Sequence, residues 1–246
     1  MTAARTLPSL RRSRLAETPS APLLTWYDLA TGERVELSHR TFDGWVAKTA
    51  GLLRDVVGLG PGATVAIDLP LHWLLAVQLA ACAELGAEAR VGGDPAEADL
   101  AVCGPDGVAA ALAAPEVLAV SLLPMAMPFR TPLPTGAEDY CLEVRSSPDR
   151  FDPSWPVLPD DPAWRLGEVV MTQGRAVAEA GAVAARVGAG PGARVLTTRA
   201  PLDADGLLAL LALPLVTAGS VVAVRGGTDD DALARIGAEE GVTARV

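Results

Sequence analysis

The feature that most constrains the fold is a phrase that the chain uses twice. Residues 57–67 read VGLGPGATVAI, and residues 187–197 read VGAGPGARVLT. Each copy follows a segment with helical periodicity and runs into a short strand-like segment. Because glycine ends helices in the left-handed region and proline prevents their continuation, the phrase predicts a helix stop that leads into a strand.

The glycines of this phrase also invite comparison with a phosphate-binding loop. Such a loop has the opposite order, in which a strand is followed by glycines and then by a helix N-terminus. That order is needed because the amides that hold the anion are the unpaired ones that open a helix. The phrase therefore predicts architecture and not an anion site.

The succession of elements after each copy is also the same, which makes this the strongest internal repeat of the chain. Helices are predicted over 71–85 and 205–217. Strands are predicted over 64–68, 88–91, 99–103, 117–121, 194–198 and 221–224. Strands that alternate with helices favour parallel sheets, so the fold class is α/β, with two pseudo-repeated, layered parallel-sheet halves.

A hairpin and a helix precede the first copy. Residues 23–37 alternate in side-chain character around Gly32, which is typical of a β-hairpin with glycine at its turn. The following apolar positions, up to Val56, recur at spacings of three and four. They predict a helix with Ser38 or Thr41 as its N-cap.

The predicted organisation is one compact domain. Residues 1–22 form a loosely ordered leader, because their arginines precede no apolar core of the kind that a secretory signal needs. Residues 23–123 form the first α/β half and residues 163–246 the second. Residues 124–162 hold nine prolines and form a connector with a short element around 140–144.

Composition excludes several kinds of partner. The formal net charge is −10 and the basic residues are scattered, which disfavours nucleic acid. Cys82, Cys103 and Cys141 have the spacing of neither a disulfide framework nor a zinc site, which indicates a reducing cytoplasm. Residues 108–129 are apolar, but prolines and a glutamate interrupt them, so we predict no membrane span.

Residue types that carry chemistry form no recognisable site. His39 and His72 lack the spacing of metal ligands and a visible catalytic partner, so we expect His39 to be a first-turn helix residue and His72 to be a helix cap or simply exposed. Two segments, Gly92-Gly93-Asp94 and Gly226-Gly227-Thr228, follow strands and precede helices, as in a ligand site at a sheet edge, but they match no nucleotide motif. Plain strand-to-helix turns are favoured for both.

The remaining candidates have ordinary structural explanations. Asp160-Asp161 and Glu239-Glu240 are adjacent pairs on what we expect to be solvated ends. Core packing explains most tryptophans, which here are Trp26, Trp45, Trp73, Trp155 and Trp164. The sequence therefore assigns no catalytic, cofactor-binding or metal-binding residue.

Two longer segments carry a family resemblance. They are GERVELSHRTFDGWVAKTAGLL (32–53) and GLGPGATVAIDLPLHWLLAVQLAACAELGAEARVGGDP (58–95). Together with the hairpin they resemble the opening of the adenylate-forming superfamily, the acyl-CoA synthetases and AMP-dependent ligases. That family typically has a G-x-x-x-G-D-x-V-A strand and a G-A-x-x-x-x-x-N-P turn. Ala63 stands in place of the first aspartate and Asp94 in place of the asparagine.

The second half departs from this family at its phosphate loop. Residues 169–172, VVMT, resemble the run after that loop, with Gln173 where histidine is usual. The loop itself, T-S-G-T-T-G-x-P-K-G, is expected just before Val169. There Pro159–Glu168 offer three acids and one glycine, whereas an anion cradle needs glycines, hydroxyls and a cation.

Other parts of the family's machinery are not recognisable either. The chain stops at Val246, before any segment that resembles the family's adenine site, hinge or C-terminal domain with its catalytic lysine. Lys48, the only lysine, lies in an early amphipathic helix. The resemblance implies a truncated N-terminal domain, as in short proteins of high-GC Gram-positive bacteria, without a cofactor.

Three functions remain open. The first is a non-catalytic module that binds a small ligand, an acyl or nucleotide fragment, in the crevice between the halves. The second is a protein-interaction subunit closed by self-association or by another chain. The third is an enzyme, either an adenylate-forming ligase with residual nucleotide binding or one whose residues meet only in three dimensions.

Overall fold

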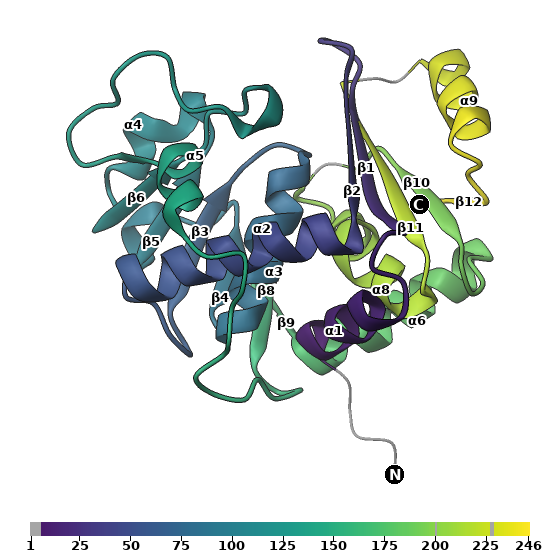
Figure 1. The fold of residues 1–246 in the computed structure, drawn as a ribbon, viewed down its shortest axis with the longest axis horizontal. Coiled ribbons are helices and arrows are strands. Elements are labelled where there is room, and N and C mark those ends of the chain that lie inside the picture. The colour runs from purple at the N-terminus through teal and green to yellow at the C-terminus, as the bar shows by residue number, and fades with distance from the viewer. Residues whose placement is uncertain (1–5, 200, 227–228) are drawn as a thin grey trace.

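The computed structural model describes residues 6–199, 201–226 and 229–246. Two β-sheets enclose a layer of helices (Figure 1), and the main apolar core takes side chains from both sheets and from those helices. A smaller apolar cluster lies on the outer face of each sheet. The predicted layered α/β class with parallel sheets is confirmed.

The larger sheet has seven strands in the order β7-β6-β5-β3-β4-β8-β9. The strands are β3 (Thr64–Asp68), β4 (Glu88–Val91), β5 (Leu100–Cys103), β6 (Glu116–Ala119), β7 (Glu138–Asp139), β8 (Pro162–Leu166) and β9 (Val169–Thr172). All neighbouring strands are parallel except the β8–β9 hairpin. Their carboxyl ends therefore meet at one edge.

The smaller sheet has five strands in the order β12-β10-β11-β1-β2. The strands are β1 (Pro22–Asp28), β2 (Glu33–Ser38), β10 (Arg194–Thr197), β11 (Ser220–Arg225) and β12 (Ala244–Arg245). β1 and β2 form the predicted hairpin, and Gly32 at its turn has a φ of +74°. The hairpin prediction is confirmed.

Each hairpin completes the sheet of the other half. β1 pairs in parallel with β11, where Leu24 lies opposite Val221, and β8 pairs in parallel with β4, where Ala89 lies opposite Trp164. The orders β5-β3-β4-β8-β9 and β12-β10-β11-β1-β2 are thus two copies of one arrangement. The halves expected at 23–123 and 163–246 differ from the two sheets, because hairpin partners are set by tertiary packing and not by chain proximity.

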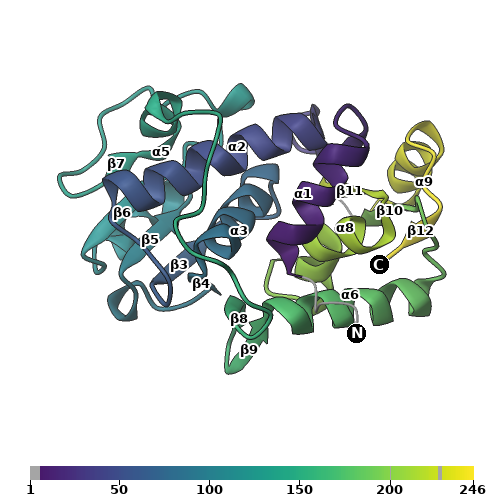
Figure 2. The same ribbon diagram turned by 60° about the horizontal axis from the view of Figure 1, so that its bottom comes forward.

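The central helices lie between the sheets (Figures 1 and 2). They are α2 (His39–Gly51), which continues as a π-helical turn (Leu52–Val56), α3 (Trp73–Leu85), α6 (Gln173–Val187), and α7 (Ala204–Leu207) with a π-helical turn (Leu208–Ala212) and α8 (Leu213–Thr217). Ser38 caps α2 by accepting the N–H of Thr41, as predicted.

Short elements cover the outer faces and the loops. α4 (Val108–Ala111) packs on the seven-stranded sheet and α9 (Asp230–Glu239) on the five-stranded sheet. The others are α5 (Tyr140–Glu143) and four 3₁₀ turns, Pro95–Glu97, Pro105–Gly107, Pro124–Ala126 and Val144–Ser146. In the described part of the chain, no helix combines the length and the apolar character that crossing a bilayer requires.

Both copies of the repeated phrase act as helix stops, as predicted. Gly58 and Gly188 have φ values of +85° and +69° at the helix ends. The last glycine of each phrase then binds the end of the next helix: Gly62 N donates to Gly86 O at 2.9 Å, and Gly192 N donates to Thr217 O at 2.7 Å. The phrase therefore joins two consecutive helices as well as a helix and a strand.

Residues 7–17 form helix α1 (Leu7–Glu17), where the sequence predicted a loosely ordered leader; residues 1–5 lie outside the described residues. Thr6 and Ser9 form a capping box, and α1 lies beside α6 and α8 in Figures 1 and 2. Leu7 and Leu10 are buried in the main core, but most of the other residues of this helix are polar, so its sequence has no strong helical pattern. Ion pairs position it as well.

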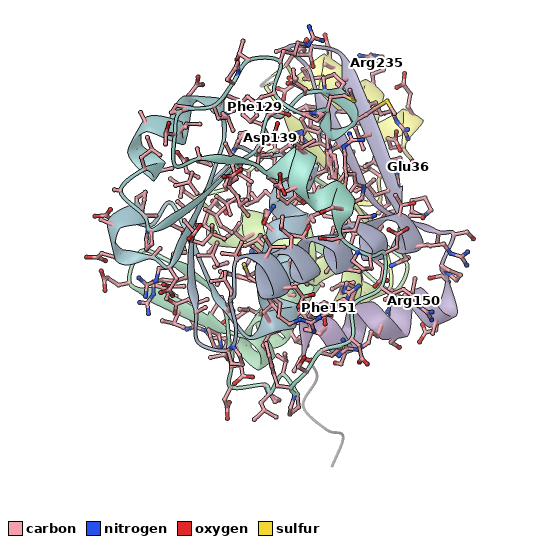
Figure 3. The ribbon with its side chains drawn as sticks, turned by 60° about the vertical axis from the view of Figure 1, so that its left-hand side comes forward. Glu36, Phe129, Asp139, Arg150, Phe151 and Arg235 are labelled. Atoms are coloured by element: carbon pink, nitrogen blue, oxygen red, sulfur yellow. The ribbon has the colours of Figure 1, made fainter. Side chains whose placement is uncertain are left out.

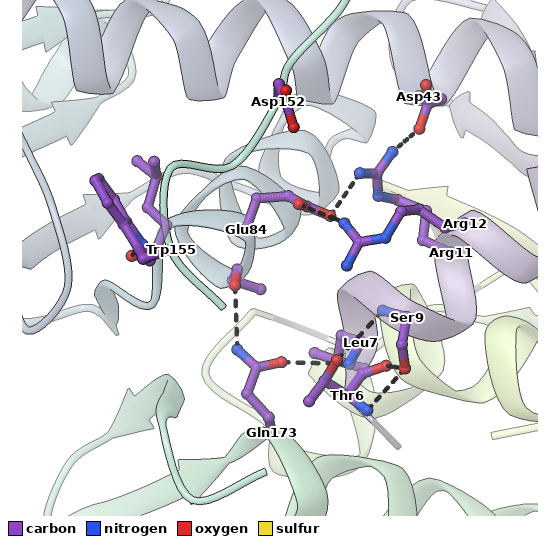
Figure 4. Close-up of polar contacts among 12 residues, drawn as sticks. Thr6, Leu7, Ser9, Arg11, Arg12, Asp43, Glu84, Asp152, Trp155 and Gln173 are labelled. Carbon is purple, nitrogen blue, oxygen red and sulfur yellow. Dashed lines mark hydrogen bonds and ion pairs between the residues drawn. The ribbon is translucent and has the colours of Figure 1, made fainter. Parts of the chain in front are cut away.

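The ion pairs of α1 converge on the buried carboxylate of Glu84 in α3 (Figure 4). Arg11 Nη2 lies 2.5 Å from Glu84 Oε1, and Arg12 Nη1 lies 2.9 Å from Oε2. Arg11 also pairs with Asp43 of α2. Because an unpaired buried carboxylate is costly, these arginines tie α1 to the central layer.

The connector runs along α2 and is held by its basic side chains. Lys48 donates to Ser147 O and pairs with Asp149, and the Arg54 guanidinium lies 4.5 Å from the centre of the Phe151 ring. Figure 3 labels Phe151 and its neighbour Arg150 in this connector. Lys48 lies in the predicted amphipathic helix, and its contacts with Ser147 and Asp149 show that the connector covers this side of α2. The short element predicted around residues 140–144 is α5.

Candidate functional site

A cavity of about 380 Å³ lies where the carboxyl edges of the two sheets meet. The seven-stranded sheet contributes the segments that follow β3, β4 and β5. The five-stranded sheet contributes Pro201 and Leu202, which follow β10, and Arg225 at the end of β11. The volume lies within the range of small-molecule sites.

This edge of the seven-stranded sheet is a topological switch point. β3 pairs with β4 on one side and with β5 on the other. The chain leaves β3 into α3 on the inner face, but it leaves β5 towards α4 on the outer face. In open parallel sheets, ligands bind in the crevice that such a divergence creates at the carboxyl ends.

The walls of the cavity are mostly apolar, with three charged side chains. Ile67, Val91 and Leu122 lie on its inner side, and Leu69 and Leu202 extend the apolar lining. The charged side chains are Asp68, Asp106 and Arg225. The Arg225 guanidinium lies 3.8 Å from Asp28 Oδ2 in β1, so part of its charge is offset from behind.

The backbone around the cavity adopts conformations that side chains rarely allow. Gly92 has a φ of +67°, and a Cβ there would lie 2.7 Å from Leu202 Cδ2. Leu122, Met125 and Ala126 have positive φ without being glycine. Ser121 Oγ donates to Met127 O and Arg145 donates to Ala126 O, which hold this loop. Strain of this kind is concentrated at ligand and active sites.

Two smaller hollows open at the same edge. One, of about 260 Å³, lies beneath α4 and shares Asp68, Gly92 and Gly107 with the main cavity. The other, of about 370 Å³, is lined by Arg90 and Arg165 among acidic residues. Both guanidiniums bind Glu88. Burial would raise the pKa of the Glu88 carboxyl, but the hydrogen bonds from Arg165 and Arg90 outweigh burial and lower it.

The histidines lie where the sequence predicted. His39 is the first residue of α2, and burial followed by the charge of Arg14 lowers its pKa. His72 caps α3, with its Nδ1 accepting the Leu74 N–H at 3.1 Å. Burial, followed by the charge of Arg225, lowers the pKa of His72 to about 3. Both imidazoles are therefore neutral at physiological pH.

The cysteines are free and buried, and burial raises the pKa of Cys82 to about 12 and of Cys103 to about 11. They are inert thiols in this fold. In the part of the chain that the structure describes, no group of three or more histidine, cysteine or acidic side chains is placed to hold a metal ion.

The other sequence candidates separate into site and scaffold. Gly92 lines the main cavity, and Gly93 lines both smaller hollows, whereas Gly227 and Thr228 lie outside the described residues. The expectation of a plain turn at Gly92 therefore understates its place at the cavity. The tryptophans are core residues, as predicted: Trp26, Trp73 and Trp164 are buried, and Trp45 and Trp155 are half-buried.

The acidic pairs serve the scaffold. Asp161 accepts the Leu158 N–H at 2.7 Å within a turn. Glu239 pairs with Arg235, but Glu240 is not on a solvated end as expected. Burial opposes its ionisation, yet hydrogen bonds from Arg34, Tyr27 and Arg194 lower the pKa of Glu240 to about 2. Arg194 and Arg34 thus hold Glu240 on the outer face of the five-stranded sheet.

No family model matches the chain. A TIGR03089 family protein of Mycobacterium tuberculosis (strain ATCC 25618 / H37Rv) is 40% identical to it over 208 residues, which cover 79% of this chain and 80% of that protein. The chain belongs to the TIGR03089 family.

Solved structures match the fold of this TIGR03089 protein over almost its whole length. An acyl-CoA synthetase of Brucella canis has a TM-score of 0.79 at 19% identity, with 98% of this chain and 47% of that chain covered. For an acetoacetyl-CoA synthetase from Streptomyces lividans the values are 0.77, 21%, 97% and 41%. For a Mycobacterium tuberculosis fatty acyl CoA synthetase they are 0.73, 15%, 96% and 48%.

These matches confirm the acyl-CoA synthetase-like fold that the sequence predicted. This chain matches the N-terminal domain of such enzymes and spans less than half the length of each of these three chains. At identities of 21% and below, the likeness concerns the fold alone. Function must be argued from the residues present.

At the position expected for a phosphate loop, the TIGR03089 protein has a tight hairpin turn. Leu166 lies opposite Val169, so only Gly167 and Glu168 connect β8 to β9. Gly167 has a φ of +55°, which the first position of a type II′ turn requires. A connection this short leaves no run of free amides to surround a phosphate.

Gln173 takes the place of the histidine expected from the resemblance to the adenylate-forming superfamily, and its side chain is buried. Its Oε1 accepts the Leu7 N–H at 3.3 Å, and its Nε2 donates to Pro162 O at 3.1 Å and to Ala83 O at 3.4 Å (Figure 4). One side chain thus joins α1, α3 and β8 at the start of α6. Its role in this protein is structural.

Sequence reasoning missed the charged residues of the cavity in the TIGR03089 protein. Asp68 is the last residue of the strand predicted over 64–68. Asp106 lies in the Gly-Pro-Asp-Gly turn that follows the strand predicted over 99–103. Because parallel strands end at one edge, these positions had a usable signal. Arg225 directly follows the strand predicted over 221–224 and had the same signal. Leu202 had none, since it lies in a loop of the other sheet.

Proposed function

We propose that this TIGR03089 protein is a non-catalytic module that binds a small ligand in the cavity between its sheets. The observation that carries the proposal is the cavity of about 380 Å³ at the switch point beside β3, to which both sheets contribute. Acyl-CoA synthetases share this fold, but a shared fold does not imply a shared activity.

The β8–β9 turn supports the non-catalytic part of the proposal. A polyphosphate site needs several backbone amides, hydroxyl groups and a cation. The turn consists of two residues, Gly167 and Glu168, and its side chain is a carboxylate. The two arginines nearest to this turn in the polar hollow are bound to Glu88. The β8–β9 turn therefore offers no binding site for the phosphates of ATP, although the resemblance would place them there.

The lining of the cavity favours an acyl-like or other apolar fragment over a nucleotide. Ile67, Val91 and Leu122 give it an aliphatic wall, whereas Asp68 and Asp106 would repel a phosphate. No cofactor is needed for this role. The buried, free cysteines suit a reducing cytoplasm, where we place the protein.

The proposal is tested by ligand titration of the full chain with hexanol and with magnesium ATP. We expect hexanol to shift NMR signals of residues around Leu122, and ATP to give neither saturable heat nor pyrophosphate release in the presence of carboxylic acids. Leu202→Trp should block the cavity and abolish the hexanol shifts. Leu142→Trp, at an exposed leucine outside the cavity, is the matched control.

Two results would overturn the proposal. Acid-dependent pyrophosphate release would restore an enzymatic function. Hexanol binding that is equal in Leu202→Trp and Leu142→Trp would move the ligand away from this cavity.

A further inference from the structure

The free edge of the smaller sheet carries a charge pattern that is complementary to a second copy of itself. We infer that two copies of this TIGR03089 protein form a dimer in which their β2 strands pair antiparallel, with a twofold axis at Val35. This pairing joins the two five-stranded sheets into one continuous sheet. The inference concerns the surface at β2 and is independent of the ligand proposed for the cavity.

β2 presents a long edge without the usual protection. The strand has six residues, lies at the margin of its sheet and pairs only with β1 (Figure 1). Such an edge is a template for another chain unless short length, proline or a charge that repels the other chain protects it. β2 reads ERVELS, which has no proline and has charges of both signs. Its edge is therefore open to a further strand.

The other three sheet margins are shorter or capped. β7 and β12 have two residues each. On β9, which has four residues, the Val170 carbonyl oxygen already accepts a hydrogen bond from Arg175 Nη1 at 3.3 Å. Among the described strands, β2 is thus the margin with the longest uncapped edge.

Backbone alternation identifies the groups of β2 that point outward. Just after β1, the Leu29 N–H donates to Arg225 O of β11 at 3.0 Å, so the odd-numbered residues of β1 face β11 and the even-numbered ones face β2. The residues of β2 opposite those even-numbered residues are Glu33, Val35 and Leu37. The backbone N–H and C=O groups of Arg34 and Glu36 therefore point away from β1. In the described part of the chain, no other element bonds to them.

Charge selects one antiparallel register for two such edges. When Val35 lies opposite the partner's Val35, Arg34 lies opposite the partner's Glu36, and these two residues can exchange both of their backbone hydrogen bonds. A slip by two residues in either direction places Arg34 opposite a second Arg34 or Glu36 opposite a second Glu36. A slip by one residue turns the side chains to the wrong faces. The twofold arrangement at Val35 is therefore the one in which opposite charges meet.

The two charged side chains are already oriented by their own chain. Arg34 Nη2 lies 2.7 Å from Glu36 Oε2, and Arg34 Nε donates to Glu240 Oε1 at 2.9 Å. Among the described residues, Arg34 Nη1 and Glu36 Oε1 form no hydrogen bond, so each side chain keeps a group for the partner. Because these side chains are held in place before association, less conformational entropy is lost when they pair.

Val35 adds an apolar contact on the other face of the strand. Its side chain is half-buried against the main core. In the register proposed, it forms a pair that is not hydrogen-bonded, in which the side chains of an antiparallel sheet approach most closely and β-branched residues stabilise the pairing. The interface thus has an apolar contact on one face and ion pairs on the other.

The test exchanges charges between two variants of the full chain and measures dimers by sedimentation velocity. We expect the wild-type chain to form dimers in a fraction that rises with concentration. Arg34→Glu and Glu36→Arg each place like charges opposite one another, and each should raise the dimer dissociation constant at least about tenfold. Mixed in equal amounts, the two variants should dimerise with each other, because every pair across the axis is then opposite again.

Two further variants serve as controls. Arg235→Glu makes the same charge change as Arg34→Glu at an exposed position of α9, where it should leave the dimer unchanged. Glu36→Pro removes an outward N–H and spares the hydrogen bonds between β1 and β2, since proline is tolerated in an edge strand at such a position. It should abolish the dimer in a folded chain, which circular dichroism verifies.

Three outcomes would overturn the inference. The first is a wild-type chain that stays monomeric at every concentration. The second is a mixture of folded Arg34→Glu and Glu36→Arg chains in which no dimer returns. The third is a dimer that persists in Glu36→Pro or is weakened equally by Arg235→Glu, because the interface would then lie elsewhere. If the charge variants do not fold, the comparison of Glu36→Pro with the wild-type chain decides.

Discussion

The two copies of the repeat build the same frame but end in different surroundings. In the first copy Asp68, the last residue of β3, and the next two residues, Leu69 and Pro70, all line the cavity. In the second copy β10 is followed by Thr198 and Arg199, which do not line it, and of the described residues in this loop Pro201 and Leu202 are the ones that do. The repeat therefore sets the positions of the strands. The residues at the carboxyl end of each strand decide which of the two sheets contributes most of the cavity lining.

The copies also differ where the second helix turns into the next strand. In the first copy a left-handed glycine, Gly86 with φ of +65°, is followed by Ala87. In the second copy the left-handed residue is Ala218 with φ of +54°, and the glycine comes one position later, at Gly219. The second turn thus accepts strain at one position in order to place a glycine at the next.

The largest effect is expected from Gly219→Ala. A Cβ at this position would lie 1.9 Å from the carbonyl oxygen of Ala193, and backbone cannot move aside cheaply. We expect a loss of at least about 3 kcal/mol in the free energy of unfolding, measured by urea denaturation. The reciprocal change Ala87→Gly should cost only about 1 kcal/mol. Equal losses in the two variants would break the comparison.

The caps of the two second helices predict different responses to pH. His72 caps α3 and Asp203 caps α7 by accepting the Gly206 N–H at 2.9 Å. The pKa of His72, about 3 in the fold, lies below the unfolded value of 6.5, so the unfolded chain binds the extra proton in that window. Stability therefore falls as the pH drops below 6.5, by about 1.4 kcal/mol per pH unit for this group.

His72→Asn should keep the cap and remove this part of the slope between pH 6.5 and 5, measured by urea unfolding at several pH values. His39, whose pKa is also lowered, retains its own contribution. Burial would raise the pKa of Asp203, but hydrogen bonds from Gly206 and Arg199 lower it. Its stabilisation is present above the unfolded pKa and lost only at more acidic pH, so Asp203→Asn should leave the slope above pH 5 unchanged.

The smallest effects are expected from the left-handed residues themselves. Gly86→Ala places a Cβ in the left-handed region without a clash, since its nearest neighbours lie at 3.8 Å, and should cost about 1 kcal/mol. Ala218→Gly removes the same strain and should stabilise by about 0.5 kcal/mol after the entropy of glycine is included. Thermal unfolding of both variants checks the signs, and matching signs would contradict the comparison.

Much of this fold could be predicted because its signals are local. The glycines of the phrase end helices wherever they stand, and the alternation around Gly32 specifies a hairpin without reference to the rest of the chain. Helix α1 was not predicted, because the contacts that position it, among them the ion pair between Arg11 and Glu84, join residues that are far apart in the sequence. The partners of the hairpins escaped for the same reason, since nothing near Leu24 indicates Val221.

The site was only partly predictable. Gly92 could be placed at a sheet edge from its position after a strand, and Asp68 could have been added by the same reasoning. Arg225 and Leu202 enter the cavity from the second sheet, so their roles depend on how the two sheets face each other. The positive φ of Leu122 has no sequence signal, because leucine avoids that region unless tertiary contacts impose it.

The exchanged hairpins have a consequence for how the protein is made. The β1–β2 hairpin is synthesised long before its parallel neighbour β11, which comes only at Ser220–Arg225. During translation this early ribbon therefore carries an unsatisfied edge that must be kept from other nascent chains. Closure of the smaller sheet is therefore expected to be a late, non-local step of folding, whose rate should limit the yield of folded molecules.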